Sequence, residues 1–370
     1  MRVLHFLDSI DRGGAEAQAL DVCRNASRFD IEITLVTAKG GAMEAEFQGT
    51  GAGYVRLDRK LPVDLNLASR LRQVILERDI QVVHGYQAVD GLHLYLATRG
   101  LKNVKRVLSF QGFIQDKKNR LTSKFLIRRM HANIAVSRGM LKWLADVDHL
   151  DTSRNFTVIY NGADPSRVKP SGKSLRAELE LPEASLLIGM VGNFYRDPRK
   201  DQMTVCRALP EVFAKFPNAH CLFAGRVEPG AEDKMAGCLN ICREHGIEDR
   251  VHFLGGRSDV PDILAALDVF VFSSLHEGLP LAVSEAMLAG VPMIVSDIEP
   301  LLEATGEGKY AEVFPVGNEN ALARRLVAML GDDGARRDMS RRAKEFAVNN
   351  FSIEAHLREL TRLYRDIARR

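Results

Sequence analysis

The sequence predicts an α/β protein made of two Rossmann-like, doubly wound domains that face each other across a cleft, and three observations lead to this expectation. Its 370 residues are more than twice a typical domain length of about 150 residues. Short apolar runs alternate with helical patterns in both halves, which is typical of parallel sheets with crossover helices. A turn-forming cluster, Asn-Gly-Ala-Asp-Pro at 161–165, lies between the halves.

The expected strands are short apolar runs bounded by turn residues or by helical patterns. In the first half they fall at 3–8, 32–37, 53–57, 82–84, 106–109, 134–136 and 157–160. In the second half they fall at 186–191, 220–224, 251–254, 269–273 and 292–296. We therefore expect one domain at 1–165 and another at 166–351, with ligands bound at the carboxyl ends of the strands.

Composition excludes several classes of protein. With 46% hydrophobic and 27% charged residues, the chain is neither collagen-like nor disordered. Five cysteines are too few for a disulfide framework, which indicates a reducing compartment. The first apolar run reaches Asp8 too early for a signal-peptide core, and no stretch approaches the roughly 18 apolar residues of a membrane span. We expect a cytoplasmic protein without a spanning helix.

The net charge of +3 gives no argument for nucleic acid, but its distribution is uneven. Residues 1–165 carry 24 Lys and Arg against 18 Asp and Glu, a balance of +6, and the remainder carries −3. Part of the surplus lies at 117–130. There Lys117, Lys118, Arg120, Lys124, Arg128 and Arg129 surround Leu121, Phe125, Leu126 and Met130. Helical spacing would place the four apolar residues on one face, which predicts peripheral contact with an anionic membrane or an anionic acceptor; the alternative is an ordinary helix with a solvated basic face.

The stretch 269–296, VFVFSSLHEGLPLAVSEAMLAGVPMIVS, carries the strongest chemical signal. A buried strand runs into a polar turn, and Pro280 suits the first position of a helix that ends at Gly290. The amides at that helix start, from Gly278 and Leu279 onward, suit a diphosphate. Glu277 lies just outside the helix, and Glu285 is eight positions later, in its second turn. Two carboxylates so spaced suit the hydroxyls at opposite ends of one extended ligand; the alternative is a capping acid and a solvated one.

This stretch resembles the retaining glycosyltransferases of group 1, also called family 4, whose hallmark is a Glu, seven residues and a second Glu. Further similarity lies in GGAE at 13–16, IAVSRGM from 134, VIYNGAD from 158, VGNFYRDPRKDQ from 191 and FLGGRSDVPDILAALDVFVFSS from 253. The resemblance implies the GT-B fold, with the nucleotide-sugar donor held mainly by the second domain. It also implies no cofactor, because the nucleotide sugar is a co-substrate, and no bound metal.

Roles follow from the resemblance residue by residue. Glu277 would contact hydroxyls of the donor sugar, Glu285 the nucleotide ribose, and backbone amides in the stretch from Gly278 through Leu279 to Pro280 the diphosphate. Asn161, in VIYNGAD, would belong to the substrate-binding residues. The C-terminal segment 352–370 would form a helix that packs back on the first domain, and its Leu357, Leu360, Leu363, Tyr364 and Ile367 follow helical spacing.

Glycines and cations at two loops add candidates. At Gly13 and Gly14 the missing side chains let backbone amides approach a phosphate or a sugar; the alternative is a tight turn. After the strand at 186–191, a loop delivers Arg196, Arg199 and Lys200, where cations would neutralise a departing diphosphate. Lys200 matches the family lysine. The family arginine commonly stands where this chain has Asn193, so we expect Arg196 to replace it.

Many relatives carry His-Gly where this chain has Gln111-Gly112. A glutamine can bind a sugar hydroxyl but cannot exchange a proton at neutral pH. His84, at the end of an apolar strand, is a second candidate for the cleft, and a core histidine is an equal alternative. Asp146-Val147-Asp148 and the pair Cys238 and Cys242 fit metal sites poorly, since neither has the right context.

The sequence thus predicts a retaining, metal-independent transferase that moves a hexose from a UDP-sugar, or alternatively a GDP-sugar, to a glycan or lipid-linked acceptor. Cell-surface polysaccharide or lipopolysaccharide synthesis is the expected setting, with the enzyme in the cytoplasm or on the inner face of the membrane. Two other classes stay open. One is a GT-B epimerase or phosphorylase, for which acid–base groups or a cofactor lysine are not evident. The other is a catalytically silent GT-B scaffold that binds a partner.

Overall fold

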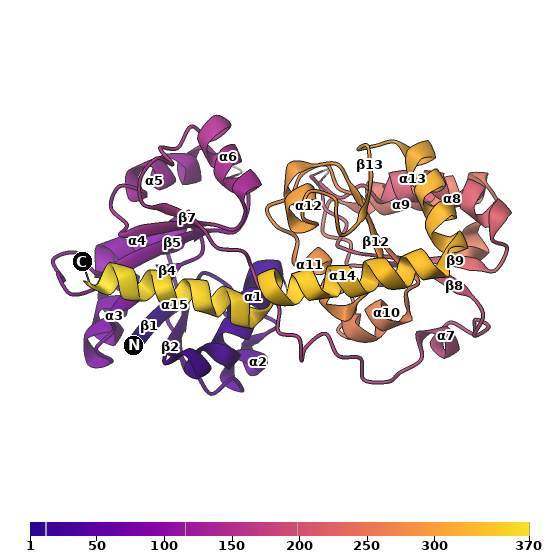
Figure 1. The fold of residues 1–370 in the computed structure, drawn as a ribbon. Coiled ribbons are helices and arrows are strands. Elements are labelled where there is room, and N and C mark those ends of the chain that lie inside the picture. The colour runs from indigo at the N-terminus through magenta and orange to yellow at the C-terminus, as the bar shows by residue number, and fades with distance from the viewer. Residues whose placement is uncertain (12, 115, 198, 370) are drawn as a thin grey trace. The chain divides into compact units, whose positions relative to one another are not determined.

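The computed structural model describes residues 1–369 except 12, 115 and 198, and divides the chain into two compact units (Figure 1). Unit 1 contains Met1–Gly162 together with the C-terminal residues from Ile353 onward, and unit 2 contains Ala163–Ser352. The boundary falls after Gly162, three residues before the position expected from the turn cluster at 161–165.

Unit 1 has a seven-stranded sheet in the order β3-β2-β1-β4-β5-β6-β7, in which all neighbouring strands are parallel. The strands are β1 Arg2–Leu7, β2 Glu32–Thr37, β3 Gly53–Arg56, β4 Val82–Gly85, β5 Lys105–Phe110, β6 Ala132–Ala135 and β7 Phe156–Val158. The helices are α1 Gly14–Asn25, the 3-10 helix η1 Ala26–Phe29, α2 Glu44–Gln48, α3 Leu65–Glu77, α4 Ala88–Ala97, α5 Lys117–Leu126, α6 Arg138–Asp146 and α15 Ile353–Arg369. All seven strands expected in the first half are present.

Unit 2 has a six-stranded parallel sheet in the order β10-β9-β8-β11-β12-β13. The strands are β8 Leu186–Val191, β9 Ala219–Ala224, β10 Val251–Gly255, β11 Val269–Phe272, β12 Met293–Ser296 and β13 Glu312–Phe314. The helices are α7 Leu175–Glu178, α8 Gln202–Lys215, α9 Glu232–Glu244, η2 Glu248–Arg250, α10 Val260–Ala266, α11 Leu281–Ala289, α12 Glu299–Ala304, α13 Glu319–Gly331 and α14 Asp333–Phe351. The five strands expected here are present, and the three-residue β13 was not foreseen.

Both sheets are doubly wound, which confirms the predicted fold class. The strand order reverses between β1 and β4 in unit 1 and between β8 and β11 in unit 2. Ligands of such sheets bind beyond the carboxyl ends of the strands at the reversal. In unit 2 this point lies between the loop after β8 and the loop after β11, which contain Lys200 and Glu277.

Close backbone contact explains one glycine in unit 2. A Cβ at Gly225 would lie 2.1 Å from the carbonyl oxygen of Gly192, so the chain after β9 touches the chain after β8. Any larger residue would separate these two loops. The glycine therefore helps to fix the backbone that leads toward Lys200.

The C-terminal helix α15 belongs to unit 1 (Figure 1). Its apolar residues join a core cluster with side chains of β1, β2 and α1. Tyr364 is buried there, and its hydroxyl lies 3.1 Å from His5 Nε2 and 2.5 Å from His84 Nδ1. The apolar stripe seen in the sequence is thus the inner face of a helix that completes the core of unit 1.

Leu357→Ala is expected to destabilise unit 1 by about 2–5 kcal/mol, the usual cost of a cavity in a packed core. Leu357 is fully buried on α15. The chain has a single tryptophan, Trp143 on α6 of unit 1, so its fluorescence during urea unfolding reports on this unit. Arg362→Ala on the exposed side of the same helix is the matched control and should change little. Equal stability of the Leu357→Ala and Arg362→Ala variants would contradict the packing of α15 into the core of unit 1.

The segment 117–130 folds differently from the prediction of one apolar face. Helix α5 ends at Leu126, because the chain turns there and Asn133 Nδ2 donates to the carbonyl of Ile127 at 3.0 Å. Leu126 and Met130 are buried, whereas Leu121 and Phe125 are exposed. The four apolar residues therefore divide between the core and the surface, and the prediction of a single apolar face is wrong.

Within the part of the chain that the structure describes, no helix is long and apolar enough to cross a bilayer.

The two motifs that fitted a metal site poorly, Asp146-Val147-Asp148 and the pair Cys238 and Cys242, contain residues that pack inside the protein. Asp148 is buried, and Arg120 Nε donates to it at 3.0 Å. Cys238 and Cys242 are buried on the inner face of α9. No cluster of three or more potential metal ligands occurs among the described residues.

Candidate functional site

The loops that follow β8 and β11 are joined by backbone hydrogen bonds. Leu275 N donates to the carbonyl of Arg199 at 2.8 Å, and Asp201 N donates to the carbonyl of Ser273 at 3.0 Å. The Ser274 hydroxyl oxygen also lies 2.5 Å from the Arg199 carbonyl oxygen. This pairing holds Lys200 next to the loop that carries Glu277, although the two residues are 77 positions apart in the sequence.

Lys200 and Glu277 form a largely buried ion pair at this point, in which Lys200 Nζ donates to Glu277 Oε1. The hydroxyl of Ser274 donates to the same oxygen at 2.8 Å, and Lys200 Nζ lies 4.1 Å from the centre of the Phe272 ring. Burial lowers the pKa of Lys200, and the carboxylate of Glu277 opposes that shift. The site thus holds two opposite charges in a partly dry environment, where each acts strongly on any charged ligand.

A second group of polar side chains surrounds this pair. Arg199 Nη2 donates to Asp197 Oδ2 at 2.5 Å, and the Arg199 guanidinium lies 4.8 Å from the centre of the Tyr195 ring. His276 Nε2 lies 3.3 Å from Asp197 Oδ1. Burial opposes ionisation of Asp197, but the hydrogen bonds and charge of Arg199 hold its pKa below the ordinary value. Asp197 therefore anchors Arg199 and His276 beside Lys200 and Glu277.

Arg196 is placed differently from the other two cations of the loop. Its side chain is exposed and lies over Gly230, where an added Cβ would be 3.4 Å from Arg196 Cδ. Asn193, at the position of the family arginine, accepts from Arg226 N at 3.0 Å through Oδ1. The structure groups Arg199, and not Arg196, with Lys200 and Glu277. Contact of Arg196 with a diphosphate stays a prediction.

Helix α11 begins at Leu281 and ends at Ala289, and the next residue, Gly290, caps it with a φ of 81°. Pro280 is the residue before the helix, one position earlier than expected. The first-turn amides of a helix have no acceptor within it, so the turn of Gly278, Leu279 and Pro280 leads into a start that suits an anion. Glu285 is the fifth helical residue, in the second turn as predicted.

Glu285 is buried, which excludes the alternative that it is a solvated helix residue. Arg167 Nη2 lies 2.6 Å from Glu285 Oε1. This partner was not predictable from the sequence, because Arg167 lies 118 positions earlier in a segment that has only the pattern of a linker. The ion pair with Arg167 orients the carboxylate of Glu285.

In unit 1, the glycine loop after β1 forms the start of α1. Gly13 is the residue before the helix, and a Cβ there would lie 2.4 Å from Glu16 Oε2. The carboxyl of Glu16 therefore folds back over the helix start, and burial raises its pKa. A Cβ at Gly14 would meet no atom within 4 Å, so this side of the loop is open.

Gln111 and Asn161 lie together at the carboxyl edge of the same sheet. Asn161 Nδ2 donates to Gln111 Oε1 at 2.9 Å, and Asn161 is buried. The next residue, Gly162, donates its amide to Gln18 Oε1 at 2.8 Å. The structure thus pairs the two predicted residues and adds Gln18, which no sequence motif indicated.

His84 is a core histidine, and the candidate role in substrate binding is not supported by its position. Both ring nitrogens are engaged, with Tyr364 at Nδ1 and with Ser109 Oγ at 2.6 Å from Nε2. Burial, reinforced by His5 and His356, lowers its pKa well below the ordinary value. The apolar run that ends at His84 pointed to an edge position, but the ring faces α15.

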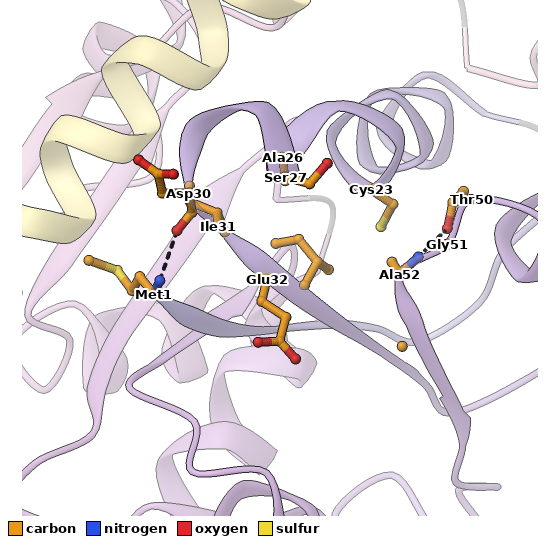
Figure 2. Close-up of a pocket in the computed structure, with 12 residues that line it drawn as sticks. Met1, Cys23, Ala26, Ser27, Asp30, Ile31, Glu32, Thr50, Gly51 and Ala52 are labelled. Atoms are coloured by element: carbon orange, nitrogen blue, oxygen red, sulfur yellow. Dashed lines mark hydrogen bonds between the residues drawn. The ribbon is translucent and has the colours of Figure 1, made fainter.

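A hollow of about 500 Å³ in unit 1 lies away from these residues (Figure 2). Residues around the starts of β2 and β3 line this hollow. The amino group of Met1, which also lines it, donates to the carbonyl of Asp30 at 2.8 Å. Strand starts lie at the edge of the sheet opposite to Gln111 and Asn161. The hollow therefore includes none of the candidate site residues.

Comparison with known proteins identifies the family. A family model described as "Glycosyltransferase Family 4" matches residues 12–167, and one described as "Glycosyl transferases group 1" matches residues 172–346. The chain is a group 1 glycosyltransferase. The resemblance read from its motifs is confirmed, and its two Rossmann-like units have the GT-B fold.

Several relatives of this glycosyltransferase have assigned activities. N-acetyl-alpha-D-glucosaminyl L-malate synthase of Bacillus anthracis is 25% identical over 317 residues, 83% of this chain and 80% of that protein. UDP-Gal:alpha-D-GlcNAc-diphosphoundecaprenol alpha-1,3-galactosyltransferase of Escherichia coli is 27% identical over 322 residues, 82% of this chain and 80% of that protein. HepE of Anabaena, solved in complex with UDP and glucose, matches with a TM-score of 0.86 at 20% identity over 99% of this chain and 100% of that chain.

Proposed function

We propose that the glycosyltransferase retains anomeric configuration and moves a hexose from a nucleotide sugar to a hydroxyl of a glycan or lipid-linked acceptor in cell-surface polysaccharide synthesis. The observation that carries the proposal is the buried pair of Lys200 and Glu277 at the strand reversal of unit 2. It is joined by Glu285 on the helix that starts four residues after Glu277. This arrangement offers a cation for a diphosphate and two carboxylates for hydroxyls.

In the proposed mechanism, Lys200 stabilises the departing nucleoside diphosphate. Its ammonium has three donors, and Glu277 uses one of them. The others can meet phosphate oxygens as the bond from the anomeric carbon to the phosphate oxygen breaks and negative charge develops there. Arg199 and Arg196 are further cations on the same loop. With protein cations supplying the charge, we propose that no divalent metal is required.

Glu277 contacts donor-sugar hydroxyls in this proposal, and Ser274 holds its carboxylate in place. Gln111 cannot act as a base, and its amide oxygen is engaged by Asn161. We therefore propose that the acceptor hydroxyl attacks from the face on which the diphosphate leaves and gives its proton to the leaving phosphate oxygen. The new bond forms where the old one breaks, which accounts for retention.

UDP-sugars are the favoured donors, with GDP-sugars as the alternative. HepE was solved with UDP-glucose as well as with UDP and glucose, and the Escherichia coli relative is named for UDP-Gal and an acceptor on diphosphoundecaprenol. A lipid-linked acceptor would place the protein on the inner face of the membrane. In segment 117–130, Lys117, Lys118 and Lys124 form no ion pair within the described residues, and they flank the exposed Leu121 and Phe125, which suits anionic lipid.

Slow donor hydrolysis tests this proposal without knowledge of the acceptor. Incubation with UDP- and GDP-sugars is expected to release nucleotide and free sugar, and proton NMR should show the sugar first in the anomeric configuration of the donor. EDTA should leave the rate unchanged. Wild type that releases no nucleotide from any donor would favour the silent scaffold, and inverted sugar would contradict the mechanism.

Glu285→Ala is expected to weaken nucleotide binding by about 1.5–3 kcal/mol, the scale of a hydrogen bond to a charged group. The carboxylate is buried and oriented by Arg167, so a ribose hydroxyl meets an acceptor that is already held in place. Isothermal titration with UDP measures the change. Glu285→Gln keeps the shape and one acceptor oxygen, and is expected to fall between the wild type and the Ala variant. Unchanged affinity in Glu285→Ala would refute the ribose assignment.

A further inference from the structure

The β3–α3 loop, defined as residues 57–65 so that it includes Leu65 at the start of α3, displays three apolar side chains to solvent. Leu61, Val63 and Leu65 are 61%, 51% and 70% exposed. Together with Leu121 at 68%, Leu65 and Leu61 are the most exposed large apolar side chains among the described residues. Such side chains are usually buried, so a cluster of them in one short loop indicates a surface that meets something apolar.

Hydrogen bonds hold this loop in its conformation. Buried Asp64 accepts from Lys60 N at 2.9 Å and from Leu67 N at 3.0 Å, and its own amide donates to His93 Nε2 at 3.0 Å. Arg59 Nη1 donates to the carbonyl of Pro62 at 3.2 Å. The backbone between the three apolar residues is therefore fixed, and their exposure belongs to an ordered loop.

Cations accompany the apolar side chains. Lys60 and Arg70 line the same cavity of about 500 Å³ as Leu61, Val63 and Leu65. Within the described residues, neither Lys60 nor Arg70 forms an ion pair with a carboxylate; Arg70 Nη2 donates instead to the carbonyl of Asp58 at 2.6 Å. Exposed apolar side chains beside two cations are complementary to a lipid surface that carries negative headgroups.

The β3–α3 loop leads into α3, which lies in one layer of helices with α4 and α5 in unit 1. Helix α4 packs against α3 and against α5, so the three helices lie side by side (Figure 1). Together they contain six Lys and Arg residues and only two acids, of which Asp90 is buried. The exposed Leu61 and Val63 precede α3 and Leu65 is its first residue, whereas the exposed Leu121 and Phe125 lie on α5.

We propose that the β3–α3 loop inserts Leu61, Val63 and Leu65 into an anionic lipid bilayer, as a second anchor beside α5. The inference deepens the proposed function, because it rests on an acceptor that is linked to lipid. Lys60 and Arg70 then meet the headgroups while the three side chains enter the acyl region. The apolar part of the attachment resists salt, and the part due to Lys117, Lys118 and Lys124 is lost as salt rises.

Vesicle co-sedimentation tests the anchor with two vesicle types, pure phosphatidylcholine and an equal mixture of phosphatidylcholine and phosphatidylglycerol. Leu61→Ser, Val63→Ser and Leu65→Ser together are expected to reduce binding to the mixed vesicles at least about tenfold, and the loss should persist in high salt. The matched control is Leu239→Ser with Val348→Ser in unit 2, whose side chains are 37% and 44% exposed. This control should bind as wild type does.

A fluorescent probe reports insertion directly. Since Trp143 is the only tryptophan, Trp143→Phe combined with Val63→Trp places a single probe on the loop. Its emission should shift to the blue on mixed vesicles and be quenched by brominated lipid. Trp143→Phe combined with Val348→Trp should do neither. Equal vesicle binding by the triple serine variant and wild type, or an unresponsive Val63→Trp probe, would overturn the proposal.

Two further outcomes separate the alternatives. Loss of a dimer in the triple serine variant, seen by light scattering without any vesicle binding of wild type, would assign the loop to self-association and overturn the lipid anchor. Donor hydrolysis in solution is a separate readout. If wild type hydrolyses the donor but does not bind vesicles, the lipid anchor is refuted and the proposed transferase activity stands. If wild type binds vesicles but does not hydrolyse any donor, the lipid anchor stands and the proposed transferase activity is refuted.

Discussion

Lys200→Met is expected to lower the rate of sugar transfer by about 10²–10³-fold, the usual effect of removing one preorganised group that stabilises developing charge. Lys200 is buried beside Glu277, and its ammonium rests over the Phe272 ring. The side chain is held before substrate arrives, so its attraction for the leaving diphosphate requires little reorganisation. Single-turnover rates with a saturating donor measure the effect.

The same substitution also leaves a carboxylate without its partner. Removing one member of a buried ion pair typically costs about 3–5 kcal/mol, because the remaining charge is uncompensated. Lys200→Met and Glu277→Gln are each expected to destabilise unit 2, whereas the double variant should recover much of that loss. Thermal unfolding followed by circular dichroism measures this coupling.

Activity in the double variant separates folding from catalysis. If the pair acts chemically, the double variant is more stable than either single variant and remains as slow as Lys200→Met. If the pair is only structural, activity returns together with stability. A Lys200→Met protein that transfers sugar at nearly the wild-type rate would refute the role of Lys200.

The fold was predictable from the sequence because parallel strands that are buried on both faces appear as apolar runs. All twelve expected strands exist, and only β13 was missed, since three residues beginning with Glu312 carry no pattern. The second-turn position of Glu285 was also predictable, because a glycine fixed the end of α11 and a proline its start. These features depend on local sequence alone.

Contacts between distant segments were not predictable. The pairing of Lys200 with Glu277 depends on β8 and β11 being neighbours, and that of Arg167 with Glu285 depends on the path of the chain after Gly162. Helical periodicity also cannot say which side of a helix meets the core. For that reason Leu126 and Met130 were assigned to the surface together with Leu121, although they are buried.

The second large expected effect is a loss of stability of unit 1 at acidic pH. Unit 1 is expected to lose about 2 kcal/mol of stability for each of three buried histidines when the pH falls from 7 to 5, or about 6 kcal/mol in total. Burial, with smaller repulsion from His356, lowers the pKa of His5 to about 3; burial lowers that of His356 to about 4 and that of His84 well below its usual value. His5 and His84 lie on β1 and β4, and His356 lies on α15.

The sign follows from proton binding. The folded-state pKa values lie below the unfolded value of about 6.5, so between these limits the unfolded chain binds more protons than the folded one. Stability is therefore complete above about pH 6.5 and falls continuously as the pH drops toward the folded values of about 4 and about 3. A loss of this size is comparable to the whole stability of many domains, about 5–15 kcal/mol.

Urea unfolding at pH 7 and pH 5, followed by Trp143 fluorescence, tests the origin of the effect. Carboxylates and the other histidines also contribute to the pH dependence, so the readout is the difference between variants. His5→Gln removes one of the three groups, keeps a polar side chain beside Tyr86 and Tyr364, and is expected to reduce the loss between the two pH values by about 2 kcal/mol. Leu357→Ala, which loosens the packing of α15 without removing a titratable group, is the control and should leave the loss between the two pH values unchanged. The change in the pH dependence is decisive, because a substitution that merely loosens the packing around α15 lowers stability equally at both pH values.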